Sequence, residues 1–280
     1  MQIHWFPGHM KKAQNEISEK VKLVDVVIEL LDARAPLASM NDSLESIFSN
    51  KKRIIVLSKP DLADQVETEK WKQYFKYKYE SVLVLDLNNP KAGKEIAAQV
   101  DILGYEKHKK EIQKGMKPQP IKTMVVGIPN VGKSSLINRF ANRSAAGVQN
   151  KPGYTRGEQW IKVNSDFILL DTPGVLPMSY DDQEKAVKLA LIGAIREEIL
   201  PNSELVHKLL GFFVKYYPNA LKPRFGITDL FDDQDVLTKI AKARGLLDGN
   251  GNLDLSKAEA VLLKEFKDGK LGNFSLERVK

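Results

Sequence analysis

The first 175 residues alternate between short apolar runs and longer segments of mixed polarity. Five runs have the length of strands and are rich in Val, Ile and Leu; they cover residues 24–31, 54–57, 82–85, 124–126 and 167–170. Several are continuously hydrophobic, which is typical of strands buried on both faces of a parallel sheet. Intervening segments, such as 67–79 and 134–141, have helical composition. The pattern predicts an α/β fold with a mostly parallel sheet flanked by helices.

The later part of the chain has a different pattern. Residues 107–122 are rich in lysine and contain Pro118 and Pro120, which predicts a solvated helix end followed by an extended connector. Beyond residue 180 the sequence predicts four helices and no strand to pair with them. These helices cover residues 183–200, 203–217, 233–243 and 256–268. We therefore predict an α/β domain over residues 1–178 and a small all-α domain over residues 179–280.

Composition narrows the class of protein. The 280 residues are 42% hydrophobic, which is ordinary for folded domains and too apolar for wholesale disorder. The absence of cysteine excludes disulfides, thiolate zinc sites and cysteine nucleophiles. No run of 18 apolar residues occurs, and the first residues lack the apolar core of a signal peptide. We expect a cytoplasmic protein without a membrane partner.

The net charge of +7 is unevenly distributed. Residues 181–280 carry 16 basic and 16 acidic side chains, so the whole excess lies in residues 1–180. An uneven basic surface suits a polyanionic partner such as nucleic acid. Many basic proteins bind no nucleic acid, so this charge alone does not identify the partner.

A phosphate-binding loop is the strongest motif. Residues 127–134, Gly-Ile-Pro-Asn-Val-Gly-Lys-Ser, fit G-x-x-x-x-G-K-[ST] between a predicted strand and a predicted helix. Backbone N–H groups of such a loop cradle the α- and β-phosphates of a nucleotide. Lys133 would neutralise the β and γ oxygens, and the Ser134 hydroxyl would bind Mg²⁺. The expected nucleotide-binding residues are Asn130, Val131, Gly132, Lys133, Ser134 and Ser135.

Two further segments have features of switches that respond to a γ-phosphate. Asp171-Thr-Pro-Gly174 follows an apolar strand, so that Asp171 can reach the Mg²⁺ shell and the Gly174 N–H can bond a γ-phosphate. Residues 151–157 are broken by glycine and proline and contain Thr155, a candidate Mg²⁺ ligand. A common turn and a surface loop are the alternative interpretations.

Base selection is predicted at Ser58-Lys59-Pro60-Asp61, here called the base-reading turn, which follows the strand at residues 54–57. The Asp61 carboxylate can accept both the ring N–H and the exocyclic amine of guanine, whereas adenine offers no such donor pair. Lys59 can lie over the base. This turn predicts a preference for GTP over ATP, although the four residues alone match many unrelated sequences.

The order of these motifs carries a family resemblance. In Ras-like GTPases the phosphate-binding loop comes first, whereas here the base-reading turn does. Together with His4-Trp-Phe-Pro-Gly-His9-Met, Asp32-Ala-Arg34-Ala-Pro36, residues 151–157 and the segment from Asp171, this order resembles the YlqF/YawG family of circularly permuted P-loop GTPases, and within it the bacterial ribosome-biogenesis members. The specific motifs cover residues 1 to about 178, and the helical remainder resembles the family in general character only.

The resemblance also implies a second base-contacting loop at Asp86-Leu87-Asn88. Asp86 and Leu87 replace the usual Ser-Ala of the family. Ser58 replaces the usual Asn, which removes an amide that would brace the base-reading turn against the phosphate-binding loop. Guanine affinity is expected to be lower for it, while Asp61 preserves selectivity.

The hydrolytic machinery is expected to differ from that of Ras. Val175 follows Gly174 at the position of the glutamine that orients water in Ras. By the resemblance, Asn130 is a candidate K⁺ ligand, and His9 is a catalytic candidate that positions or deprotonates water, beside Lys133, Thr155 and Gly174. Asn130 could instead stabilise only its own turn, and His9 could cap a helix or contact RNA.

Two features of the helical part are assigned structural roles. Residues 248–259 resemble an EF-hand loop, but Leu253 stands where glycine is required, so we predict a turn before a helix capped by Ser256 with Glu259 in a capping box. The aromatic residues Phe212, Phe213, Tyr216 and Tyr217 are more typical of a core than of a base-stacking platform.

The resemblance implies a Mg²⁺-dependent GTPase of late large (50S) subunit assembly. It would bind the pre-50S particle, with its rRNA and ribosomal proteins, in the GTP state and leave after hydrolysis, as a monomer away from the ribosome. Val175 predicts slow intrinsic turnover that the particle stimulates. A signalling or membrane-associated GTPase with a protein effector is the alternative, although no lipidation motif is present. An ATP-driven remodeller is a third.

Overall fold

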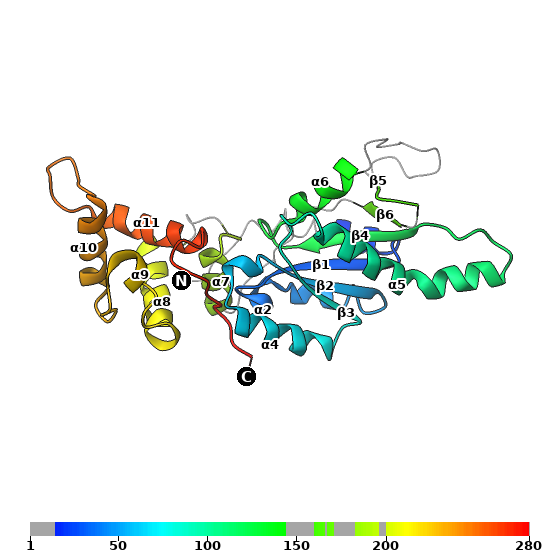
Figure 1. Ribbon diagram of the computed structural model, residues 1–280, viewed down its shortest axis with the longest axis horizontal. Helices are drawn as coiled ribbons and strands as arrows, with labels where there is room; N and C mark the ends of the chain where they lie inside the picture. The colour runs from blue at the N-terminus through cyan, green and yellow to red at the C-terminus, as the bar shows by residue number, and fades with distance from the viewer. Residues whose placement is uncertain (1–14, 144–159, 166, 171–182, 196–199, 280) are drawn as a thin grey trace.

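The computed structural model describes residues 15–143, 160–165, 167–170, 183–195 and 200–279. These residues form a six-stranded sheet with helices on both faces, followed by a helical region that lies beside it (Figure 1). None of the described helices is both long enough and apolar enough to cross a lipid bilayer.

The sheet has the spatial order β3-β2-β1-β4-β6-β5. All neighbours are parallel except β5, which is antiparallel to β6, so the predicted α/β class is confirmed. The five predicted strands are present, and β5 is an addition. The strand bounds are β1 Val26–Asp32, β2 Lys52–Ser58, β3 Ser81–Leu85, β4 Ile121–Gly127, β5 Trp160–Lys162 and β6 Phe167–Leu170.

Helices cover the two faces of this sheet. Side chains of α5 and α6 share a core with one face of β1, and α4 packs on the opposite face of β2. The Asp64 carboxylate begins α4 by accepting the N–H groups of Val66 and Glu67. The helices of this part are α2 Pro36–Ser39, α3 Asp42–Glu45, the short 3₁₀ helix η1 Pro60–Leu62, α4 Gln65–Lys76, α5 Ala92–Gln113 and α6 Lys133–Arg143.

The helical region contains α7 Gln183–Leu191, α8 Asn202–Tyr216, α9 Lys222–Phe225, α10 Asp233–Arg244 and α11 Leu255–Lys267. The helix predicted over residues 183–200 is therefore too long. Gly193 adopts a left-handed φ of 76°, and its N–H and that of Ala194 bond back to the carbonyls of Ala190 and Leu189. This arrangement ends α7, because such bonds satisfy the last carbonyls of a helix.

The start of α11 also differs from the prediction. Asp254, and not Ser256, is the N-cap, and its carboxylate accepts the N–H of Lys257 at 2.9 Å. The preceding loop is held by Asp248, whose Oδ1 accepts the N–H groups of Asn250 and Asn252. These local bonds of Asp248 close the acidic loop into a compact turn.

A continuous core joins the helical region to the sheet. The cluster includes Ile28 of β1 and Phe213 of α8, and both are fully buried. Phe213 packs against Phe266 and Phe274. The expected core role of the aromatic group is thus confirmed for Phe213, whereas Tyr216 is 37% exposed beneath the Arg278 guanidinium.

Candidate nucleotide-binding site

The strand register brings the predicted motifs to one edge of the sheet. Leu30 pairs with Gly127, Asp32 pairs with Ser58, and Ser58 pairs with Leu85. The carboxyl ends of β1, β2, β3 and β4 therefore lie side by side. The chain runs outward from β1 to β3 and then returns through α5 to β4, so the strand order reverses between β1 and β4. Open α/β sheets bind ligands in the crevice at such a point.

The loop between β4 and α6 has the backbone of a phosphate cradle. Gly132 has a φ of 110°, and a Cβ atom there would lie 2.8 Å from Cδ1 of Leu87. A Cβ atom on Gly127 would lie 2.7 Å from the carbonyl oxygen of Leu30. Asn130 adopts a left-handed φ of 59°. Gly127 and Gly132 are thus required by close packing against Leu30 of β1 and Leu87 beyond β3, which lets the backbone itself line the site.

Lys133 lies at the start of α6 and is 8% exposed. Its Nζ donates to the carbonyl oxygens of Gly127 and Ile128, at 3.0 and 2.9 Å. Ser134 and Ser135 follow in the first helical turn and are exposed. The Lys133 ammonium and the helix N-terminus suit the negative charge of a phosphate chain, and the exposed serine hydroxyls suit its Mg²⁺.

Asn130 connects this loop to the helical region. Its side-chain Nδ2 donates to the carbonyl oxygen of Gly193 at 2.8 Å. Gly193 lies in the turn that ends α7, so the phosphate loop and the helical region share a hydrogen bond. In this pairing the amide nitrogen faces Gly193.

Ser58 joins the base-reading turn to the phosphate loop. Its hydroxyl lies 2.9 Å from the carbonyl oxygen of Val131 and 3.0 Å from that of Leu31. The serine hydroxyl thus contacts the phosphate loop although the amide of the usual Asn is missing, and the lower guanine affinity expected for Ser58 stays a prediction. The hydroxyl is short, but the loop after β4 brings the Val131 carbonyl within its reach across the end of β1.

The rest of the turn is shaped by backbone geometry and charge. Lys59 has a left-handed φ of 55°, and Pro60 and Asp61 follow in η1, where Asp61 is exposed. The Lys59 ammonium lies 3.2 Å from the buried carboxylate of Asp32, which also forms a bidentate pair with Arg34. Burial alone would raise the pKa of Asp32, but Arg34 and Lys59 outweigh burial and lower it. Asp32 is therefore a fixed negative charge behind the turn.

The predicted second base loop is held by a residue that the motifs did not indicate. The Asp86 carboxylate accepts the N–H of Asn88 at 2.8 Å, and Leu87 is buried. Arg139 of α6 donates to the carbonyls of Leu87 and Asn88, at 3.1 and 2.7 Å. Arg139 lies six residues after Lys133 on the same helix, so α6 contacts both the phosphate loop and this loop.

Four predicted site residues, His9, Thr155, Asp171 and Gly174, lie outside the described residues, as does Val175. The described part of the site therefore comprises the base-reading turn, the second base loop and the phosphate loop.

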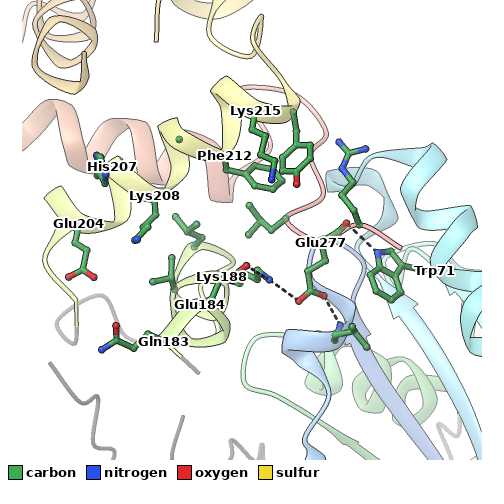
Figure 2. A pocket seen from close by; sticks show the side chains of 17 residues that line it. Trp71, Gln183, Glu184, Lys188, Glu204, His207, Lys208, Phe212, Lys215 and Glu277 are labelled. Carbon is green, nitrogen blue, oxygen red and sulfur yellow. Dashed lines mark hydrogen bonds and ion pairs between the residues drawn. The ribbon is translucent and has the colours of Figure 1, made fainter. Parts of the chain in front are cut away.

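A groove of about 970 Å³ lies between α7, α8 and residues 276–278. Figure 2 shows Glu277 at its inner wall, with its carboxylate between Lys188 and the backbone of α2. This carboxylate accepts the N–H groups of Leu37 and Ala38 at 2.7 and 3.1 Å, and the Glu277 carbonyl accepts the indole N–H of Trp71. Burial raises the pKa of Glu277, and Lys188 and the two N–H groups offset part of that rise.

Known proteins of similar sequence and structure match nearly the whole chain. The family model described as "50S ribosome-binding GTPase" matches residues 122–210. The chain is 42% identical to ribosome biogenesis GTPase A of Bacillus cereus, over 99% of this chain and 94% of the relative. It is 30% identical to the protein of the same name from Thermotoga maritima, again over 99% and 94%. The crystal structure of GNP-bound YlqF from T. maritima superposes with a TM-score of 0.68 at 28% identity, and covers 95% of this chain and 98% of that one.

Proposed function

Because the chain belongs to the ribosome biogenesis GTPase A family of circularly permuted GTPases, we propose that it acts in late assembly of the large ribosomal subunit. It binds the pre-50S particle with GTP bound and leaves after hydrolysis. The observation that best supports a guanine nucleotide site is the contact of Ser58 with Val131, at 2.9 Å, which places the base-reading turn beside the phosphate loop.

Each described motif has a chemical task in this proposal. Asp61 accepts the N1–H and the exocyclic amine of guanine, Lys59 lies over the ring, and the loop at Asp86 and Leu87 borders it. The N–H groups of the phosphate loop bind the phosphate oxygens, and Lys133 exchanges its bonds to Gly127 and Ile128 for the β and γ oxygens.

Mg²⁺, when bound, neutralises charge on the β- and γ-phosphates. Ser134 is the described residue proposed to hold it, and its exposed hydroxyl in the first turn of α6 fits that role. Thr155 and Asp171 are the other proposed ligands. The Gly174 N–H is proposed to bond the γ-phosphate.

Hydrolysis is proposed to be slow in the free protein. Val175 has no polar atom to orient water, so His9 is proposed to position it. Asn130 is proposed as a K⁺ ligand through its Oδ1, since its Nδ2 is bonded to Gly193. Docking on the particle would then complete the geometry that the free chain lacks and increase turnover.

Charge supports an RNA-containing partner. The excess of +7 lies in residues 1–180, and the groove beside the helical region is bordered by Lys188, Lys208, Lys215 and Arg278. Acidic residues, including Glu184 and Glu204, share this groove. The mixed lining fits a particle that offers both RNA and protein better than it fits bare RNA.

Sedimentation on a sucrose gradient tests the partner. With a non-hydrolysable GTP analogue the protein should comigrate with pre-50S particles, and with GDP it should remain at the top. A protein that stays free in both conditions would favour a signalling GTPase. Lys133→Ala should stay free with either nucleotide, which controls for nonspecific adhesion.

Turnover measurements test the enzymatic part. Phosphate release should be slow for the protein alone and faster when particles are added. Equal rates with and without particles would contradict the stimulation. Competition of ATP against labelled GTP separates the ATP-driven alternative, because Asp61 should exclude adenine.

A further inference from the structure

The base-reading turn is held at its far end by a segment from the other end of the sequence. Residues 274–278, here called the strap, run from the helical region along α2 toward α4 (Figure 1). The N–H of Phe274 donates to the carbonyl of Leu62 at 3.1 Å. Leu62 directly follows Asp61 and is the last residue of η1. The strap therefore contacts the residue adjacent to the proposed base reader.

A hydrogen-bonded node lies two residues further along. The N–H of Asp64 donates to the Ser275 hydroxyl at 3.2 Å, and the Tyr217 hydroxyl donates to the Asp64 carboxylate at 3.1 Å. The same Tyr217 oxygen accepts the N–H of Ser275 at 3.1 Å. Asp64 in turn caps α4. Tyr217 and Ser275 thus fix the point at which the turn becomes a helix.

Contacts at the other strap residues keep this node in place. The Leu276 N–H donates to the Arg34 carbonyl at 2.7 Å, and Arg278 forms an ion pair with Glu67 at 2.9 Å. Glu277 bonds the backbone of α2 and accepts from Trp71. Each strap residue therefore has a polar contact with the sheet domain, so the strap is a rigid support and not a loose tail.

The turn is consequently fixed on both sides of Asp61. Ser58 attaches its beginning to the phosphate loop, and the strap with Tyr217 attaches its end to the helical region. Between these points lie only Lys59, Pro60, Asp61 and the two residues before Asp64. Both attachments therefore determine where the Asp61 carboxylate lies. This position matters because hydrogen bonds are directional, and a displaced carboxylate could not meet both donors of a flat base well.

We propose that Tyr217 and Ser275 are positioning residues for guanine recognition. They hold the end of the base-reading turn so that both oxygens of Asp61 face the base. The inference rests on the proposed role of Asp61 and extends it, since it makes the helical region a part of the base-specificity site. Neither residue is expected to touch the nucleotide.

The test compares GDP with inosine diphosphate. Inosine lacks the exocyclic amine of guanine, so it can form only one of the two hydrogen bonds to Asp61. Tyr217→Phe and Ser275→Ala should each weaken GDP binding about fivefold, because a displaced Asp61 carboxylate would only weaken its charge-assisted bonds to guanine and not lose them. Inosine diphosphate binding should change much less. Titration calorimetry on the full chain gives both affinities, and the ratio between them is the readout.

Matched variants separate a positioning role from a structural one. Tyr216→Phe removes a hydroxyl from the adjacent residue, whose ring lies beneath Arg278, and should leave the ratio unchanged. Ser275→Ala leaves the aromatic packing of Tyr217 intact, so it tests the node without disturbing the core. The inference would be overturned if Tyr217→Phe and Ser275→Ala left the ratio of the GDP and inosine diphosphate affinities unchanged, whether or not both affinities fell.

Asp61→Ala tests base reading by Asp61 separately from positioning by Tyr217 and Ser275. If Asp61 reads the base, this variant abolishes the preference for GDP, and adding Tyr217→Phe to it changes the ratio no further. If Asp61→Ala retains the preference, the base-reading assignment fails and the inference fails with it. If Asp61→Ala abolishes the preference while Tyr217→Phe and Ser275→Ala keep it, only the strap inference is wrong.

Discussion

The hydroxyl oxygen of Ser58 lies 2.9 Å from the main-chain oxygen of Val131, although the two residues are 73 positions apart in the chain. Ser58 ends β2 and Val131 lies beyond the end of β4, with β1 between these strands. The contact spans the crevice at which the strand order reverses. The turn predicted to read the base and the predicted phosphate loop are therefore in direct contact in the described structure.

Ser58→Ala should weaken both GDP binding and stability. Removal of the hydroxyl eliminates the bond to Val131 and should cost about 1 kcal/mol of unfolding free energy, because the carbonyl remains buried. Calorimetric titration with GDP and urea unfolding measure the two effects. Ser49→Ala removes an exposed hydroxyl that bonds Ser46, and it should change neither. Unaltered GDP affinity in Ser58→Ala would show that the brace does not matter for binding.

Asp61→Asn should change the preferred base from guanine to xanthine. The amide offers one donor and one acceptor, which matches the C2 carbonyl and N1–H of xanthine. Loss of a charge-assisted bond should lower GTP affinity by about tenfold to a hundredfold. Binding of GTP and XTP to native and variant protein provides the measurement. A uniform loss for both nucleotides would contradict direct reading by Asp61.

Arg139→Ala should loosen the second base loop. The guanidinium bonds the carbonyls of Leu87 and Asn88, and no alanine can replace these bonds. GDP affinity should fall severalfold, and GDP dissociation, followed with a fluorescent analogue, should become faster. The control is Asn138→Ala, an exposed neighbour on α6. Identical dissociation rates for the two variants would argue against this role for Arg139.

Asp32 should make stability dependent on pH in the acid range. Its pKa is lowered below the ordinary 3.8, despite burial, by Arg34 and Lys59. A lowered pKa contributes stability that is complete above the ordinary value and disappears as the pH falls through the native value. Urea unfolding of the native protein should thus show a steep loss of stability below about pH 4.

Asp32→Asn removes this titration and leaves Arg34 without its buried partner. It should cost about 3–5 kcal/mol at pH 7, and its stability should fall less steeply below pH 4. Asp235→Asn breaks an exposed ion pair with Lys239 and should cost less than about 1 kcal/mol. If Asp32→Asn retained the steep acid loss, carboxylates elsewhere would account for it.

The architecture was predictable where the sequence has a strong period or a specific motif. Continuous apolar runs predicted β1, β2, β3, β4 and β6, because strands covered on both faces are mostly apolar. The strand β5 has three residues and too few positions for a pattern. The helix α5 was largely missed, because its buried side includes Gly93 and Gly104, which weaken the apolar pattern; at Gly104 the helix lies directly against Ile121 of β4.

The candidate site was predictable only in part. The phosphate loop and the base-reading turn have local motifs, and the register explains why both lie at one edge. Arg139, Tyr217 and Ser275 have no such motif, since their relevance comes from tertiary contacts. The bond of Asp64 to Ser275 joins residues 211 positions apart, and no local pattern encodes such a pair.

That separation also affects how the protein is made. During translation the turn containing Asp61 emerges early, while Tyr217 and Ser275 are still to be synthesised. Closing so long a loop is slow compared with the formation of a helix or a hairpin. If Tyr217 and Ser275 position the turn as proposed, a nascent chain would gain its full affinity for guanine only after the C-terminal residues have folded onto Asp64.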